Sequence, residues 1–253
     1  MRSISELCDL SGKVAIVTGS GGGLGYGIAD RFAEAGAAVV INDINPASVS
    51  RAVEQLAKPG RKLASVVADI SQRADVNRVL GVALEAFGRV DILVNNAGIF
   101  TRQPVLEMTD EAWDGVIAVN LRGAFLCSQV MGKQMVAQGQ GGKIVNMSSR
   151  AGLMAAKDDL IAYATTKAGL IHMTRVLARA LAPHQIRVNA LAPVSVDTGK
   201  PRITSTTTLD QIPLGRLGRV DDVALATLFL VSDMSDFVTG ITIPIDGGAV
   251  FAT

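Results

Sequence analysis

The chain has 253 residues, of which 49% are hydrophobic and 19% are charged, so it can bury a large core and lacks the composition of a disordered protein. Its 24 basic and 23 acidic residues nearly cancel, which leaves no field that would gather nucleic acid or an anionic membrane surface. No apolar run reaches the roughly 20 residues of a membrane span, and because the first ten residues lack the apolar segment of a secretory signal, we expect a cytoplasmic protein.

Short runs rich in β-branched residues alternate along the chain with segments of helical length. The runs are almost continuously hydrophobic, as expected of strands covered on both faces of a parallel sheet. The alternation predicts an α/β protein with a doubly wound parallel sheet, the Rossmann fold, in a single domain over residues 1–253. We expect an N-terminal extension at 1–10 and a substrate loop at 194–212. The expected strands are 14–18, 38–42, 64–68, 92–95, 143–147, 187–191 and 242–245, and the expected helices are 25–35, 46–57, 74–87, 110–137, 163–181 and 220–232.

Three expected helices have recognisable ends. Thr109, followed by two acidic residues, has the pattern of an N-cap, and Gly36 and Gly88 stand where a glycine ends a helix. Cys8 and Cys127 belong to no CxxC or metal-like cluster, so we expect reduced cysteines and no metal site.

The first expected strand runs into a glycine-rich loop, TGSGGGLG at residues 18–25, and then into a helix. Glycines permit positive φ and close approach of the backbone, and a helix N-terminus presents free N–H groups. A flexible turn is the alternative for a glycine run alone, but the strand and helix around this one favour a site for the pyrophosphate of a dinucleotide. The contacts are expected from Gly19, Gly22, Gly23, Leu24 and Gly25.

Asp43 follows the second expected strand, about 20 residues after the glycine loop. A carboxylate there can accept hydrogen bonds from the ribose hydroxyls of NAD and would repel the 2′-phosphate of NADP. Neither Gly22 nor Ile44 is an Arg or Lys that could hold that phosphate. An isolated aspartate would more often be a solvated strand end, but beside the glycine loop Asp43 predicts NAD as the cofactor and disfavours NADP.

Further motifs follow in order along the chain: Asp69–Ile70, NNAG at 95–98, Asn120, the serines that end 144–149, and the YxxxK pattern from Tyr163 to Lys167. With the TGxxxGxG loop, this ordered set resembles the short-chain dehydrogenase/reductase family, in the variant of this length, almost from end to end. The resemblance implies an oxidoreductase that transfers hydride to or from a nicotinamide dinucleotide.

Tyr163 and Lys167 lie four residues apart on an expected helix and therefore on one face of it. Removing the hydroxyl proton of an alcohol requires a base, and a phenol with its reference pKa of about 10 is a poor one. A lysine charge beside the phenol favours the phenolate. Alone, the pair would indicate a surface helix; with the other motifs it indicates catalysis, and in the family this lysine also binds the nicotinamide ribose.

The resemblance assigns roles to the remaining motifs. Ser149 would hydrogen-bond the substrate oxygen, with Ser148 as the fallback. Asn120 would hold a water molecule that connects the lysine to solvent in the proton relay, and its side chain could at the same time satisfy the backbone groups at a helix kink. Ser149 precedes Tyr163 by 14 residues, one more than is usual, which indicates an extra residue near 157–159. The implied cofactor contacts are Asp69 and Ile70 at the adenine, Asn96, Ala97 and Gly98 at the adenosine ribose, and Val196 and Thr198 at the carboxamide and phosphates.

Valine stands at position 194, where the family commonly has glycine after the sixth strand. Because a Cβ restricts positive φ, we expect either a different turn or a reshaped approach for the substrate. His172 and His184 lack suitable partners for a general base and are expected to be surface or packing residues.

These observations predict an NAD-dependent enzyme that interconverts a secondary alcohol and a ketone. Compared with the family that the chain resembles, the 194–212 loop is a few residues shorter and lacks the typical helical lid, which favours a polyol, a sugar acid or a small hydroxy compound. One alternative is a 3-ketoacyl-thioester reductase, which Asp43 disfavours because such enzymes usually take NADPH; another is a non-catalytic dinucleotide-binding sensor, which the filled catalytic positions disfavour. The resemblance further implies a homotetramer formed through helices 110–137 and 163–181.

Overall fold

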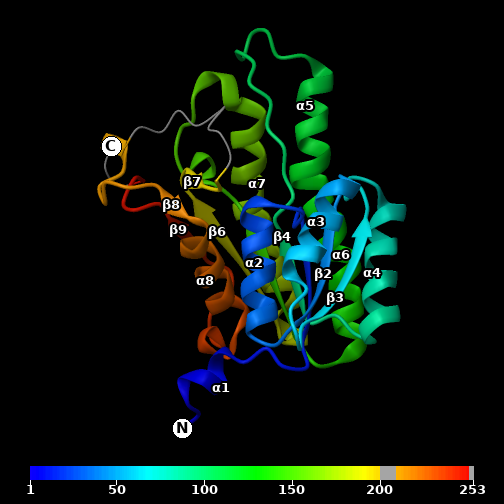
Figure 1. The fold of residues 1–253 in the computed structure, drawn as a ribbon. Coiled ribbons are helices and arrows are strands. Elements are labelled where there is room, and N and C mark those ends of the chain that lie inside the picture. Colours follow the sequence, from blue (N-terminus) through cyan, green and yellow to red (C-terminus); the bar gives the residue numbers. More distant parts are fainter. Residues whose placement is uncertain (200–208, 251–253) are drawn as a thin grey trace.

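A seven-stranded parallel sheet forms the centre of the computed structural model, which describes residues 1–199 and 209–250 (Figure 1). The strand order is β3-β2-β1-β4-β5-β6-β9, and every neighbouring pair is parallel. The predicted doubly wound sheet is therefore confirmed. The strands are β1 (Val14–Thr18), β2 (Ala38–Asp43), β3 (Lys62–Val67), β4 (Ile92–Asn95), β5 (Gly142–Met147), β6 (Ile186–Pro193) and β9 (Thr242–Ile245), and a separate two-residue ladder joins β7 (Val196–Asp197) to β8 (Gly218–Arg219).

Helices cover both faces of this sheet. Strand residues alternate between two hydrophobic clusters: Val17 faces one with Phe32 and Leu230, and its neighbour Ile16 faces the other with Met131. Each such side chain contributes about 1.5–3 kcal/mol when it leaves water. One face carries α2 (Gly23–Glu34), α3 (Pro46–Leu56) and α8 (Val220–Val231), and the other carries α4 (Arg73–Phe87), α6 (Ala124–Gln138) and α7 (Ile161–Leu181).

The element boundaries follow the predictions closely, with one internal difference. The strands predicted at 14–18, 92–95 and 242–245 begin and end at those residues in the structure. Thr109 is an N-cap, since its hydroxyl accepts a hydrogen bond from Ala112 N (3.3 Å). Gly88 (φ 76°) and Gly36 (φ 93°) end their helices. The single helix predicted at 110–137 is instead α5 (Asp110–Ile117), a π-helical segment (Ala118–Gly123) and α6. A π turn inserts an extra residue into an otherwise continuous helix, and the sequence prediction did not include one.

The stretch Asp110–Gln138 is long and apolar enough to cross a membrane by length and composition alone. Half of its apolar window is buried inside the protein, where Leu126, Met131 and Met135 pack against the sheet. An internal helix of the core passes the same test, and this packing accounts for its hydrophobicity.

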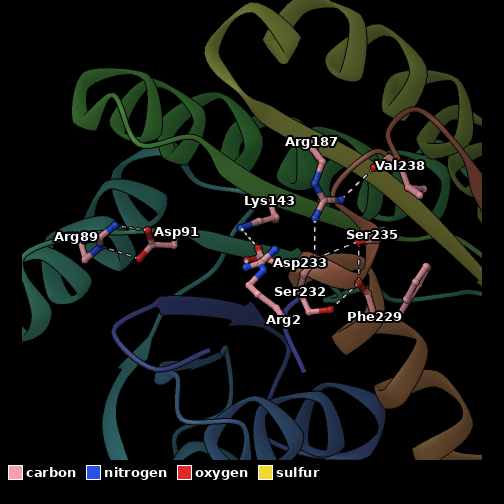
Figure 2. Close-up of polar contacts among 10 residues, drawn as sticks. All are labelled: Arg2, Arg89, Asp91, Lys143, Arg187, Phe229, Ser232, Asp233, Ser235 and Val238. Atoms are coloured by element: carbon pink, nitrogen blue, oxygen red, sulfur yellow. Dashed lines mark hydrogen bonds and ion pairs between the residues drawn. The ribbon is translucent and has the colours of Figure 1, made fainter. Parts of the chain in front are cut away.

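The N-terminal extension is held at the amino edge of the sheet. It forms the short helix α1 (Ile4–Cys8), and Arg2 pairs with Asp233 (2.6 Å) just beyond α8, a contact that Figure 2 shows beside Lys143 and Arg187. Arg187 donates to Ser232 O (3.1 Å) and Val238 O (3.0 Å). Figure 1 shows α1 and the C-terminal end of α8 at one end of the strands and α5 at the other.

Candidate active site

The glycine-rich loop joins β1 to α2 with the backbone geometry that its sequence predicts. Gly19 and Gly23 have positive φ, of 64° and 58°, and Gly22 is the N-cap of α2. A Cβ on Gly25 would lie 2.3 Å from the carbonyl oxygen of Gly19 and 2.5 Å from the side-chain Nδ2 of Asn96, so only glycine fits there. The start of α2 thus approaches the end of β1 closely, with its free N–H groups available to an anion.

A cavity of about 310 Å³ lies at the carboxyl edge of β1, β2 and β4, where the strand order reverses. This crevice is where doubly wound sheets bind their ligands. Seven predicted cofactor residues line it: Gly19, Asp43, Asp69, Ile70, Asn96, Ala97 and Gly98. The lining also includes five residues that were not predicted to contact the cofactor, namely Asn42, Ile44, Ala68, Ile99 and Val119. Each is next in sequence to a predicted site residue, and this adjacency is the sequence feature that could have indicated it.

Asp43 stands at this cavity with its carboxylate oriented by the backbone. One oxygen accepts a hydrogen bond from Gly21 N (3.2 Å) and the other from Asn45 N (3.0 Å). The cavity lining contains a second carboxylate, Asp69, and no Arg or Lys among the residues that the structure describes.

Asn96 uses its side chain to fasten the cofactor loops to each other. Its amide nitrogen donates to Thr18 O (2.9 Å) and Gly19 O (3.1 Å), while the Thr18 hydroxyl accepts from Asn96 N (3.0 Å) and Ala97 N (3.1 Å). Thr18, the first residue of the glycine-rich motif, is therefore a positioning residue whose role the sequence did not predict.

The other predicted cofactor residues lie outside the cavity lining. Thr198 reaches the glycine loop, since its methyl carbon would lie 3.8 Å from a Cβ on Gly23. Val196 packs against the hydrophobic core instead. The predicted substrate loop, 194–212, falls partly at 200–208, which lies outside the described residues.

Tyr163 and Lys167 come together on α7 as predicted. The Lys167 Nζ lies 5.4 Å from the centroid of the Tyr163 ring and donates to Met147 O (2.7 Å) at the end of β5. Burial lowers the pKa of Lys167 from 10.5 to about 8. Burial also raises the pKa of the Tyr163 phenol above its ordinary value, and a hydrogen bond with the Ser149 side chain partly offsets that rise.

The two candidate serines have different partners. Ser149 follows β5 and caps a 3-10 turn (Arg150–Gly152), where its hydroxyl accepts from Ala151 N (3.2 Å) beside Tyr163. Ser148 is buried and donates to Lys167 O (2.8 Å), so it anchors α7. The structure thus favours Ser149 over the fallback.

Asn120 lies buried in the π-helical segment between α5 and α6. Its amide nitrogen donates to Ile99 O (2.8 Å) and to the Thr166 hydroxyl (3.2 Å), and its oxygen accepts from Ile99 N (2.8 Å). A Cβ on Gly98 would lie 3.2 Å from the Asn120 oxygen and 3.5 Å from the Lys167 Nζ, so the two side chains converge there.

Phe100 and Val194 each make contacts that the sequence did not predict. Phe100 packs its ring edge-on to Tyr163, with centroids 6.0 Å apart, and nothing local in the sequence indicated this contact. Val194 needs no positive φ: among the described non-glycine residues only Gln185 adopts one. A turn that needs no glycine at this position is the first of the two expected outcomes, and the Val194 side chain packs with Ile212 and Ala249 in a small cluster.

The remaining polar candidates have no place in the site. His172 and His184 are exposed, and no group of His, Cys, Asp or Glu able to hold a metal occurs within residues 1–199 and 209–250. Both cysteines are free, and burial raises the pKa of the Cys127 thiol to about 12, which makes it unreactive.

Together, the side chains of Tyr163, Lys167 and Ser149 form a cluster, with the Lys167 Nζ close to Gly98 of the cavity lining. The phenol can exchange a proton, the ammonium can stabilise the phenolate, and the serine can polarise an oxygen. This is the equipment required to interconvert an alcohol and a carbonyl compound with a nicotinamide cofactor.

Comparisons with known proteins agree with this arrangement. A family model described as Enoyl-(Acyl carrier protein) reductase matches residues 19–250. A hydroxy(phenyl)methyl-succinyl-CoA dehydrogenase subunit of Thauera aromatica is 41% identical, over 94% of this chain and 97% of its own. The 2-dehydro-3-deoxy-D-gluconate 5-dehydrogenase of Escherichia coli is 39% identical, over 94% of this chain and 96% of its own.

Solved structures share the whole fold. A gluconate 5-dehydrogenase from Burkholderia cenocepacia in complex with NADP and tartrate has a TM-score of 0.92 and 34% identity, and covers 99% of this chain and 100% of its own. A 3-ketoacyl-(acyl-carrier-protein) reductase from Brucella melitensis complexed with NADH has a TM-score of 0.89 and 39% identity, and covers 96% and 100%. The chain is thus an enzyme that uses a nicotinamide dinucleotide, and it belongs to the short-chain dehydrogenase/reductase family of oxidoreductases.

Proposed function

We propose that this enzyme is an NAD-dependent dehydrogenase that oxidises a secondary alcohol of a sugar acid or polyol to the ketone. The observation that carries the cofactor choice is the cavity lining, which presents the carboxylates of Asp43 and Asp69 and, in its described part, no cationic side chain. A ribose with free hydroxyls fits such a lining, whereas a 2′-phosphate would meet like charge.

The residues that would hold the dinucleotide are those that form the cavity, the glycine loop and the start of α7. The narrow backbone approach at Gly25 and the free N–H groups of α2 fit its pyrophosphate. The proposed contacts are Gly19, Gly22, Gly23, Leu24, Gly25, Asp43, Asp69, Ile70, Asn96, Ala97, Gly98, Tyr163, Lys167, Val196 and Thr198.

The catalytic roles are proposed for four side chains. A nicotinamide held by the cofactor residues would supply the acceptor for the hydride of the carbinol carbon. Tyr163 accepts the hydroxyl proton at its phenolic oxygen, and Ser149 donates a hydrogen bond to the same substrate oxygen. Lys167 stabilises the phenolate, and Asn120 holds the segment at Ile99 and connects Lys167 to the proton relay.

The cofactor proposal is tested by kcat/KM for NAD and NADP with the wild type and Asp43→Asn. We expect a preference for NAD of roughly 100-fold, equivalent to about 2.8 kcal/mol, and a smaller preference in the variant. Asp236→Asn, an exposed change at the opposite edge of the sheet, is the matched control and should leave the ratio unchanged. A wild-type preference for NADP would reject the assignment.

The substrate proposal is supported by the relatives that act on gluconate derivatives and by the tartrate in the Burkholderia cenocepacia complex. The relatives that act on acyl thioesters favour a second candidate, a 3-ketoacyl-thioester reductase. An NAD-reduction screen across sugar acids, polyols, hydroxy acids and 3-hydroxyacyl thioesters separates the two. Turnover of the thioesters alone would replace the first proposal with the second.

We also propose a cytoplasmic homotetramer. The outward surfaces of α6 and α7 expose Phe125 and Val176, which are 42% and 54% accessible, and a second copy of the chain would cover them.

A further inference from the structure

Two segments that border Tyr163 are joined to each other by an ion pair. One is the segment after β4, which carries Phe100, and the other is the loop that leads into α7. The Arg102 Nη1 lies 2.6 Å from the Asp159 Oδ2, and the Gln103 backbone N–H donates to the Asp159 carbonyl oxygen (3.1 Å). Asp159 belongs to a 3-10 turn (Asp158–Leu160) that ends directly at α7, in the stretch where the sequence indicated an extra residue.

The segment from Ile99 to Gln103 is thereby fixed at both ends. Asn120 binds both backbone groups of Ile99, and Asp159 binds Arg102 and Gln103. Phe100 lies between these anchors and contacts Tyr163, with an interplanar angle of 75°. The position of the Phe100 ring against the catalytic tyrosine therefore depends on both anchors.

The ion pair is more enclosed than an ordinary surface pair. The Arg102 and Asp159 side chains are 26% and 27% exposed, and the second carboxylate oxygen of Asp159 is buried, with no hydrogen-bond partner in the described part of the chain. Exposed pairs contribute little, but a partly desolvated carboxylate depends on its counter-charge.

We propose that Arg102 and Asp159 are positioning residues that form a latch, which holds the two segments that border Tyr163 together and thereby sets the affinity for the alcohol. The latch acts on binding and not on proton transfer, because the three proton-transfer side chains have contacts of their own: Lys167 donates to Met147 O of β5, and Ser149 accepts from Ala151 N and bonds the Tyr163 side chain. Breaking the latch should therefore raise KM for the alcohol and change kcat little. This proposal rests on the alcohol oxidation proposed above.

The test compares Arg102→Gln, Asp159→Asn and the charge swap R102D/D159R with the wild type. We expect KM for the alcohol to rise about tenfold in each single variant, a loss of about 1.4 kcal/mol. We expect kcat and the Kd for NADH to change less than about twofold and the swap to recover part of the lost affinity. An unchanged KM, or a swap that is no better than the single variants, would overturn the latch.

The matched control is Asp233→Asn, which breaks the ion pair with Arg2 at the opposite edge of the sheet, also 2.6 Å long (Figure 2). It should leave KM for the alcohol unchanged; an equal rise in KM in this control would mean a general loss of stability and would contradict the proposal.

Hydrogen exchange tests the latch without any substrate. The amide of Gln103 should lose protection in Arg102→Gln, since its acceptor is the Asp159 carbonyl. If the wild type turned over none of the alcohols or thioesters, the proposed function would fail, while loss of protection at Gln103 would still support the latch. Unchanged protection there would reject the latch whatever the activity.

Discussion

At the scale of single residues, Tyr163 carries the proposed proton transfer. Burial raises the pKa of its phenol, so Tyr163 needs Lys167 and Ser149 in order to act as a base. Tyr163→Phe removes the hydroxyl and keeps the ring that packs against Phe100. We expect turnover to fall by about 10²–10⁴-fold.

The binding of NADH, followed by fluorescence, is the control for this variant. It should remain within about twofold of the wild type, because the ring stays in place. Full turnover in Tyr163→Phe would remove the tyrosine from the mechanism.

Lys167 illustrates the energetic cost of a functional charge. Its pKa in the folded protein, about 8, lies below its unfolded value of 10.5, so between these pH values the unfolded chain binds more protons. The free energy of unfolding should therefore rise with pH across this window, and the buried charge costs about 3 kcal/mol at pH 7. We expect Lys167→Met to abolish turnover and to stabilise the cofactor-free protein at pH 7 by about 1–3 kcal/mol.

Urea unfolding of wild type and Lys167→Met at pH 7 and at pH 10.5 checks this expectation. The increase in the free energy of unfolding caused by Lys167→Met should be smaller at pH 10.5, because the wild-type lysine is then neutral in the folded protein. A variant that is less stable at pH 7 would show that the bond from Lys167 to Met147 O outweighs the burial of the charge.

At the scale of elements, the contact between the glycine loop and α2 sets the geometry of the pyrophosphate site. A methyl group on Gly25 would meet the Gly19 carbonyl at 2.3 Å, so α2 must move away from the loop. We expect Gly25→Ala to cost about 1–3 kcal/mol of stability and to weaken NADH binding by at least about tenfold.

Gly81→Ala is the matched control, because Gly81 lies exposed within α4 with nothing within 4 Å of an added Cβ. It should stabilise the protein by about 0.5–1 kcal/mol without changing NADH binding. Thermal unfolding and NADH titration of both variants measure these effects. Equal behaviour of the two substitutions would show that the close approach at Gly25 is unimportant.

At the scale of the whole molecule, the proposed assembly follows from the surfaces of α6 and α7. Light scattering at micromolar concentration should give about four times the 26.3 kDa chain mass, and Val176→Glu should lower it by placing a charge in the covered surface. A monomeric wild type at that concentration would exclude the tetramer.

Much of the fold and part of the site could be predicted from the sequence alone. Continuous hydrophobic runs determine the buried strands, and the glycine loop, Asp43 and the Tyr163–Lys167 pair depend on local spacing. These features follow from backbone periodicity and from neighbours within a few residues, which the order of amino acids expresses directly.

Only the tertiary structure decided the rest. It directs Ser149 to Tyr163 and Ser148 to the Lys167 carbonyl, converts the helix around Asn120 into a π turn, and gives position 194 a turn without positive φ. It also brings Arg102 and Asp159, 57 residues apart, into contact. The physical reason is that side-chain direction and long-range pairing depend on how helices and loops pack on the sheet, which no local pattern records.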